Sequence, residues 1–197
     1  MTTPALVLIA VLVVLAVWGS AVYNRLRLLR NRVENAWAQI DVQLKRRYDL
    51  IPNLVEVARG YMAHEARTLE AVTQARNQAC AANQALHARV GGSDALGTLA
   101  VAEQALGGSL GRLMVVAEAY PALKADAQMQ SLSEEIASTE NRIGFARQAY
   151  NDEVMAFNDK ACQFPDLIWA RLLGFAHLDM MQSTANVQER LTPQVRF

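Results

Sequence analysis

An uncharged apolar segment near the N-terminus constrains this chain more than any other feature of its sequence. From Pro4 to Tyr23 the residues read PALVLIAVLVVLAVWGSAVY, and none of them carries a charge. As an α-helix with a rise of about 1.5 Å per residue, the segment is about 30 Å long, which matches the hydrocarbon core of a bilayer. The sequence therefore predicts a transmembrane anchor over residues 1–23.

A cleaved secretory signal is the main alternative to an anchor. Such a signal begins with a basic region and ends at a cleavage site of small residues, whereas the opening MTTP contains no Lys or Arg. We therefore favour an uncleaved, single-pass anchor.

Basic and aromatic residues flank the predicted span. The positive-inside rule counts basic residues close to a span, and four arginines follow this one: Arg25, Arg27, Arg30 and Arg32. They predict a protein of the cell (inner) membrane with its N-terminus outside and its body in the cytoplasm. Trp18 and Tyr23 fall where aromatic anchors stand at the inner interface, although either can equally be an ordinary residue of the span.

The charge balance and the cysteines exclude several other classes of protein. The 19 basic and 19 acidic residues cancel, so beyond the arginines after the span no basic stripe suggests nucleic acid. Cys80 and Cys162 are isolated in helical stretches and would face a reducing compartment, so they predict neither a disulfide nor a paired metal site.

Residues 24–162 carry the periodicity of amphipathic helices. Apolar residues recur at steps of three and four, and Arg47 occupies the one polar position of this seam: Leu26, Leu29, Val33, Ala36, Ile40, Leu44, Ile51, Leu54 and Ala58. Further helices are expected over residues 64–90, ending at Gly91 and Gly92, from Ser93 to Tyr120, and from about Gln128 to Ala161. No useful length of sequence alternates with period two. The expected fold is all-α, an antiparallel up-and-down bundle of four long helices whose first helix continues the span.

Two places compete for the end of the first helix. Pro52 and Gly60 both disfavour helix. A break near Gly60 makes the first and fourth helices similarly long and the second and third similarly short, which suits a closed bundle. The seam also keeps its phase through Pro52. We favour a first helix that continues through Pro52, with a kink there, and turns near Gly60.

Antiparallel packing would bring charged residues of the first and fourth helices to the same level. It places Arg47 level with Glu140, and Ile40 and Asp41 level with Arg147. We predict a structural polar cluster inside the bundle, made of Arg47, Asp49, Glu140 and Arg147. The alternative is that these long side chains reach the surface, as charged residues beside an apolar seam usually do.

Three glycines lie inside the predicted third helix, where each costs about 1 kcal/mol relative to alanine. Gly107, Gly108 and Gly111 predict a close approach of another helix that offsets this cost, and the alternative is a break in the helix.

The C-terminal region, residues 163–197, divides into an apolar segment and a polar tail that begins at Gln182. The apolar segment stands where a descending fourth helix would return to the bilayer, so we predict an interfacial segment or a protein contact. Capping of the bundle core is the alternative. Its apolar residues are Leu167, Ile168, Trp169, Leu172, Leu173 and Phe175.

No catalytic motif is found. His64 and Glu65 begin like a zincin helix, but position 68 is Thr, so the second metal-binding histidine is missing. His87 and His177 lack the Glu three residues earlier that a di-metal bundle requires. We expect no enzyme activity, no cofactor, no metal and no small-molecule substrate.

Several segments of the chain resemble the LemA family. RRYDLIPNLVE at residues 46–56 is the strongest signature, and it lies within VENAWAQIDVQLKRRYDLIPNLVEVARGYMAHEARTLEAV. The other matching segments are Ala75-Arg76, VVAEAYPALKA and TENRIGFARQAYNDEVMAFN. The resemblance implies a single-span α-helical membrane protein with a long helical bundle, and it brings no catalytic residues. The chain after Phe175 departs most from the common pattern.

Taken together, these features predict a membrane-anchored helical scaffold that associates with itself or recruits other membrane proteins at the cytoplasmic face. A sensor that transmits a signal through the span is the rival, and it requires the bundle to lie outside. An enzyme is the third candidate and would need a pocket with strongly shifted ionisable groups.

Overall fold

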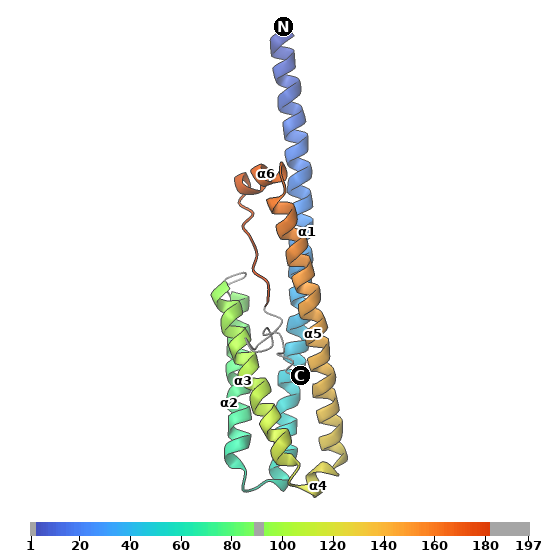
Figure 1. Cartoon of the computed structure of the whole chain (residues 1–197), viewed down its shortest axis with the longest axis vertical. Coiled ribbons are helices and arrows are strands. Elements are labelled where there is room, and N and C mark those ends of the chain that lie inside the picture. The colour runs from blue at the N-terminus through green and yellow to red at the C-terminus, as the bar shows by residue number, and fades with distance from the viewer. Residues whose placement is uncertain (1–2, 89–92, 182–197) are drawn as a thin grey trace, which may run out of the picture. The chain divides into compact units, whose positions relative to one another are not determined.

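Every regular element in the described chain is a helix. The computed structural model describes residues 3–88 and 93–181 (Figure 1). Its helices are α1 (Thr3–Tyr61), α2 (Ala66–Ala88), α3 (Ser93–Ala117), α4 (Pro121–Lys124), α5 (Ala127–Cys162) and α6 (Asp166–Leu172). The predicted all-α class is therefore confirmed. The predicted stop at Gly91 and Gly92 and the polar tail from Gln182 lie outside the described residues.

The first helix continues through its proline. α1 contains Pro52 and ends at Tyr61, so the favoured turn near Gly60 is confirmed. The third helix is shorter than expected, because α3 ends at Ala117 and Pro121 instead begins the short helix α4. Proline suits this first helical position, since its φ is already helical and its missing N–H would have no partner within the helix.

The chain forms two compact units. Unit 1 combines Met1–Trp37 with Ala149–Met180, and unit 2 combines Ala38–Gln148 with Met181–Phe197. α1 and α5 each contribute to both units. The domain limits expected at residues 23 and 162 stay a prediction.

Unit 2 contains a helical core around the second half of α1. Ile40, Leu44, Ile51, Leu54 and Ala58 are all buried, as the seam predicts. α2 and α3 pack against each other in this unit (Figure 1). α1 and α5 run antiparallel in this unit. Arg46 and Arg47 of α1 contact Glu135 and Glu140 of α5. Further along α1, the Tyr61 hydroxyl donates to Asp126, which precedes α5 in the sequence. This pairing agrees with an up-and-down order of the long helices.

Unit 1 contains the apolar first half of α1. Its large residues from Leu6 to Val17 are 40–66% exposed. This section of α1 is long and apolar enough to cross a membrane, and only 11% of its most apolar window is buried. Asp94–Ala117 meets the same test of length and composition with a lower hydropathy of 1.2. Further along α1, the seam residues Leu26 and Leu29 are buried, as are Val154 and Phe157 of α5.

The glycines of α3 do not mark a close helix contact. α3 is continuous through Gly107, Gly108 and Gly111, so the predicted alternative of a break is wrong. A Cβ added at any of the three would meet no atom within 4 Å, so the expected close approach is also wrong within the described chain. These glycines lie on the exposed side of α3, where their helical cost is not offset by a neighbour.

Candidate functional site

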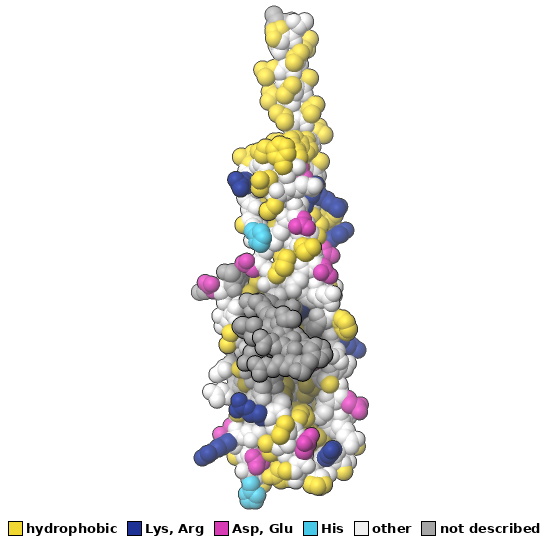
Figure 2. Space-filling model, in the orientation of Figure 1, with side chains coloured by type: hydrophobic (Ala, Val, Ile, Leu, Met, Phe, Trp, Pro, Cys, Tyr) yellow, Lys and Arg dark blue, Asp and Glu magenta, His cyan; other side chains and the backbone are white. Residues whose placement is uncertain are grey.

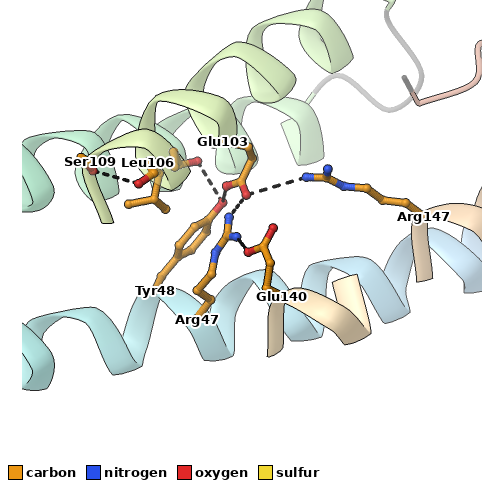
Figure 3. A network of polar contacts seen from close by, with 8 residues as sticks. Arg47, Tyr48, Glu103, Leu106, Ser109, Glu140 and Arg147 are labelled. Carbon is orange, nitrogen blue, oxygen red and sulfur yellow. Dashed lines mark hydrogen bonds and ion pairs between the residues drawn. The ribbon is translucent and has the colours of Figure 1, made fainter. Parts of the chain in front are cut away.

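Arg47 is a fully buried charged residue in the seam of α1. It is only 1% exposed, and its guanidinium donates to two carboxylates from different helices (Figure 3). One amino group bonds Oε2 of Glu103 on α3, and the other bonds Oε2 of Glu140 on α5. Arg47 therefore connects three helices of unit 2 through ionic hydrogen bonds.

Glu103 is the centre of this polar cluster. Its side chain is 4% exposed, and each of its carboxylate oxygens has a partner. Oε2 accepts from Arg47 and lies 3.9 Å from an amino group of Arg147 on α5, while Oε1 accepts from the Tyr48 hydroxyl (Figure 3). We use the name "Glu103 cluster" for Arg47, Tyr48, Glu103, Glu140 and Arg147.

Burial shifts the pKa values of three members of this cluster. Removal from water lowers the pKa of Arg47 to about 10, so this side chain still carries its proton at neutral pH. Burial also lowers the pKa of Arg147 and raises the pKa of Tyr48 above its ordinary value. Tyr48 therefore acts as a neutral hydrogen-bond donor beside charged partners.

Pro52 leaves a backbone carbonyl of the same segment without its helical donor. In a regular helix the N–H of residue 52 would bond the carbonyl of Tyr48, but proline has no N–H. Nε of Arg76 on α2 donates to this carbonyl at 3.1 Å. The proline in RRYDLIP thus frees an acceptor that α2 uses, and Tyr48 is buried at 3% exposure.

Two further polar contacts attach this section of α1 to its neighbours. Arg46 forms a surface ion pair with Glu135 of α5, and its Nη2 lies 2.5 Å from Oε1 of that carboxylate. Asp41 accepts from the amide of the buried Asn83 on α2 at 2.7 Å and pairs with Lys45 at 2.7 Å. RRYD and the turn of helix before it therefore contact α2, α3 and α5.

The structure brings together only some members of the cluster expected from the sequence. Arg47 contacts Glu140, and Arg147 approaches the same cluster through Glu103. Asp49 is exposed on α1 and does not belong to the cluster. Sequence reasoning missed Glu103 and Tyr48. A usable signal was that Glu103 is the one charged residue between Asp94 and Arg112 in an otherwise apolar helix.

The side chains of the Glu103 cluster are arranged as a structural contact between helices. Both oxygens of Glu103 are engaged, and the arginine Nε atoms of the cluster are buried without hydrogen-bond partners in the described chain. Among the side chains that the structure describes, no group of three from His, Cys, Asp or Glu could hold a metal ion. A buried, paired set of charges of this kind adds little net stability, but losing one partner is costly.

The predicted membrane-flanking residues lie in unit 1. Trp18 packs edge-on against Trp169 with ring centroids 6.2 Å apart, and Tyr23 lies 5.9 Å from Phe175. Arg25, Arg27 and Arg32 are exposed, whereas Arg30 pairs with Glu34 at 3.4 Å. In the predicted interfacial segment, Ile168, Leu172 and Leu173 are exposed, while Leu167, Trp169 and Phe175 are half-buried.

Comparison with known proteins decides the family. The family model of LemA matches residues 36–197, which include the whole RRYDLIPNLVE signature. This chain belongs to the LemA family. The matched residues include Arg46 and Arg47, their partners on α5, and helix α6.

Curated relatives extend the similarity towards the N-terminus. Magnetosome proteins MamQ 2 and MamQ 1 of Paramagnetospirillum magneticum are each 24% identical over 212 residues, covering 97% of this chain and 77% of the relative. Magnetosome protein MamQ of Magnetospirillum gryphiswaldense is 22% identical over 189 residues, covering 88% of this chain and 70% of its own length. With the long apolar α1, these findings make the chain a membrane-associated helical protein of the LemA family.

Proposed function

We propose that this LemA-family protein is a membrane-anchored scaffold that associates with further copies of itself at the cytoplasmic face. α1 supplies the anchor, and the helices of unit 2 supply a rigid body held by the Glu103 cluster. The proposal includes no catalysed reaction, because the one buried carboxylate at the centre of the polar cluster is committed to Arg47 and Tyr48.

The exposed side of α3 is the observation that carries self-association. Val101 and Val115 are 68% and 69% exposed, and the exposed glycines between them have open space around them. A helix surface of small residues lets a second helix approach closely, which would offset the helical cost of those glycines. Within the described chain nothing fills this role, so a second copy is the proposed occupant.

Native mass spectrometry of the full chain in mild detergent tests this proposal. We expect an oligomer that a Val101→Glu, Val115→Glu double variant reduces to monomer. Phe145→Glu on α5 is the matched control, since Phe145 is equally exposed at 73% but lies on another helix. A wild-type chain that is strictly monomeric at all concentrations would contradict self-association.

The cytoplasmic placement rests on the basic flank of α1. Arg25, Arg27 and Arg32 are exposed just after the apolar section, where the positive-inside rule applies. Labelling of the exposed Cys162 with an impermeant maleimide tests it. We expect labelling only after the cells are opened. Labelling in intact cells would reverse the topology and favour the sensor.

A further inference from the structure

Helix α6 is fixed against α1 at the end of the predicted span. The ring of Trp169 packs edge-on against Trp18, with an interplanar angle of 85°. A Cβ added at Gly19 would lie 3.0 Å from the same ring, so the missing side chain at position 19 is what lets Trp169 lie on the backbone of α1.

Contacts on the other side of α6 fix it to α5. Asp166 is buried at the start of α6 and pairs with Lys160 of α5 at 2.5 Å. Ala170 is 1% exposed, and Phe175, just after α6, packs on both Phe157 and Tyr23. These contacts determine which face of α6 is left uncovered.

The uncovered face of α6 is strongly apolar. On α6, Ile168 and Leu172 are 58% and 74% exposed, and their spacing of four residues places them on one face of the helix. Phe164, in the turn before α6, is 78% exposed. We call these three exposed residues the apolar stripe. Figure 2 shows hydrophobic side chains gathered at the level of α6, below the hydrophobic side chains of the exposed section of α1. Scattered exposed apolar residues are ordinary, but a stripe beside an exposed membrane-length helix is a surface that needs an apolar neighbour.

The position of α6 along α1 indicates which neighbour that is. Gly19 lies four residues before Tyr23, the last residue of the apolar segment, which corresponds to about 6 Å along a helix. Interfacial helices bury their apolar face about 5–10 Å into the boundary between headgroups and acyl chains. The exposed Arg171 and Arg25 lie in the same unit and suit anionic headgroups.

We propose that α6 is an interfacial helix that, together with Phe164 in the turn before it, inserts Ile168 and Leu172 into the membrane surface where α1 leaves the bilayer. The lipid surface, rather than a second copy, is the proposed occupant because α6 packs on Trp18 and Gly19, at the end of the exposed apolar section of α1. This second attachment would fix the orientation of unit 1 at the membrane. It goes beyond the proposed scaffold function and does not depend on self-association.

Site-directed fluorescence of the full chain in vesicles tests this inference. Cys80 and Cys162 are replaced by serine, and a nitrobenzoxadiazole dye is attached to a single cysteine introduced by Leu172→Cys. The vesicles contain phosphatidylcholine and phosphatidylglycerol, with or without lipids brominated close to the headgroup. Met155→Cys is the matched control, since Met155 is exposed on α5 in the same unit.

We expect a blue-shifted emission at position 172 and the loss of most of its fluorescence to brominated lipid, with neither effect at position 155. Polar replacement of the stripe by Phe164→Asn with Ile168→Asn should abolish the quenching at position 172, whereas Ala176→Asn should not. Flotation with the vesicles confirms that α1 is still inserted in every variant.

Three results would overturn the inference, and the first two concern the emission at position 172. One is a water-like emission at position 172 that brominated lipid does not quench. The other is a blue shift without quenching that disappears when the protein is diluted with empty vesicles, which would identify a second copy as the occupant. Quenching that survives in the polar-stripe variant would also contradict it, because the lipid contact would then not arise from these residues.

Discussion

The two halves of α1 differ in what surrounds them. From Leu6 to Val17 the helix exposes large apolar side chains, whereas from Ala38 to Tyr61 it buries an apolar seam that contains one arginine. The first half needs only an apolar medium, because hydrophobic burial is non-directional and proportional to area. The second half needs particular partners at particular positions, since a buried charge is tolerated only when it is paired and hydrogen-bonded.

This difference explains where sequence changes should matter. In the apolar half, an aliphatic residue can be replaced by another, because the hydrocarbon of a bilayer does not distinguish between them. Around Arg47 a substitution leaves a charge, a carboxylate or a carbonyl without its partner. The RRYDLIP signature is accordingly the section of α1 where identity, and not only hydrophobicity, is required.

Glu103→Ala should cause the largest loss of stability. It leaves Arg47 buried with only the half-exposed Glu140 as a partner, and breaking a buried pair costs about 3–5 kcal/mol. The free energy of unfolding is measured by chemical denaturation of the full chain in mild detergent. Leu12→Val in the exposed half of α1 is the control and should leave that value unchanged. An equal loss of unfolding free energy in the two variants would contradict the difference between the two halves of α1.

Arg76→Ala should have the next largest effect. It leaves the buried carbonyl of Tyr48 without a donor, which costs about 1–3 kcal/mol. In a Pro52→Ala background the amide at position 52 can bond this carbonyl, so the same substitution should cost less. The test compares Arg76→Ala in both backgrounds by chemical denaturation. An identical cost in each would mean that Pro52 and Arg76 are not coupled through Tyr48.

Glu140→Ala should destabilise unit 2 by only about 1 kcal/mol, because the pairing of a solvent-exposed partner is weak. The Glu140 side chain is 56% exposed, so water can replace it, and Glu103 still holds Arg47. Arg46→Ala at the surface pair with Glu135 should cost about 0.2–1 kcal/mol. Denaturation curves rank the two variants against Glu103→Ala. A Glu140 effect as large as that of Glu103 would place the centre of the cluster on α5.

Acid should weaken the junction between α1 and α5 by a smaller amount. The pKa of Asp126 is held below its ordinary 3.8, first by the N–H of Met129 and then by the Tyr61 hydroxyl. Because the folded pKa is lowered, this stabilisation is present above pH 3.8 and is lost as the pH falls through the folded value. Asp126→Asn should reduce the acid dependence of unfolding. Titration of the Asp126 carboxyl by NMR checks the direction, and a raised pKa would contradict it.

The sequence predicted the helices well and the Glu103 cluster incompletely. The seam from Leu26 to Ala58 determined the phase of α1 because burial selects residues at helical spacing, and the same phase placed Arg47 inside. Glu103 was not predicted, because matching the lengths of the first and fourth helices does not show which residue of α3 lies at the level of Arg47. Asp49 was wrongly grouped with Arg47, since two positions along a helix is about 200° of rotation.

Other features were not accessible from periodicity alone. Gly107, Gly108 and Gly111 suggested a contact within the chain, but small residues on a helix do not say whether their neighbour belongs to the same molecule. The bond between Arg76 and the Tyr48 carbonyl joins a proline effect on α1 to a side chain on α2, so it required the packing of the two helices. The stripe on α6 depended on knowing which of its residues face Trp18 and α5.

A double-mutant cycle of Arg47→Ala and Glu103→Ala in the full chain tests the central claim most directly. If these residues form the buried connection between α1 and α3, each single variant leaves the other charge buried without its partner. The double variant should then be more stable than the sum of the single effects predicts. A coupling energy of about 1–3 kcal/mol is expected for residues in direct contact. Strictly additive effects would show that Arg47 and Glu103 act independently, and the account of the RRYDLIP signature would be wrong.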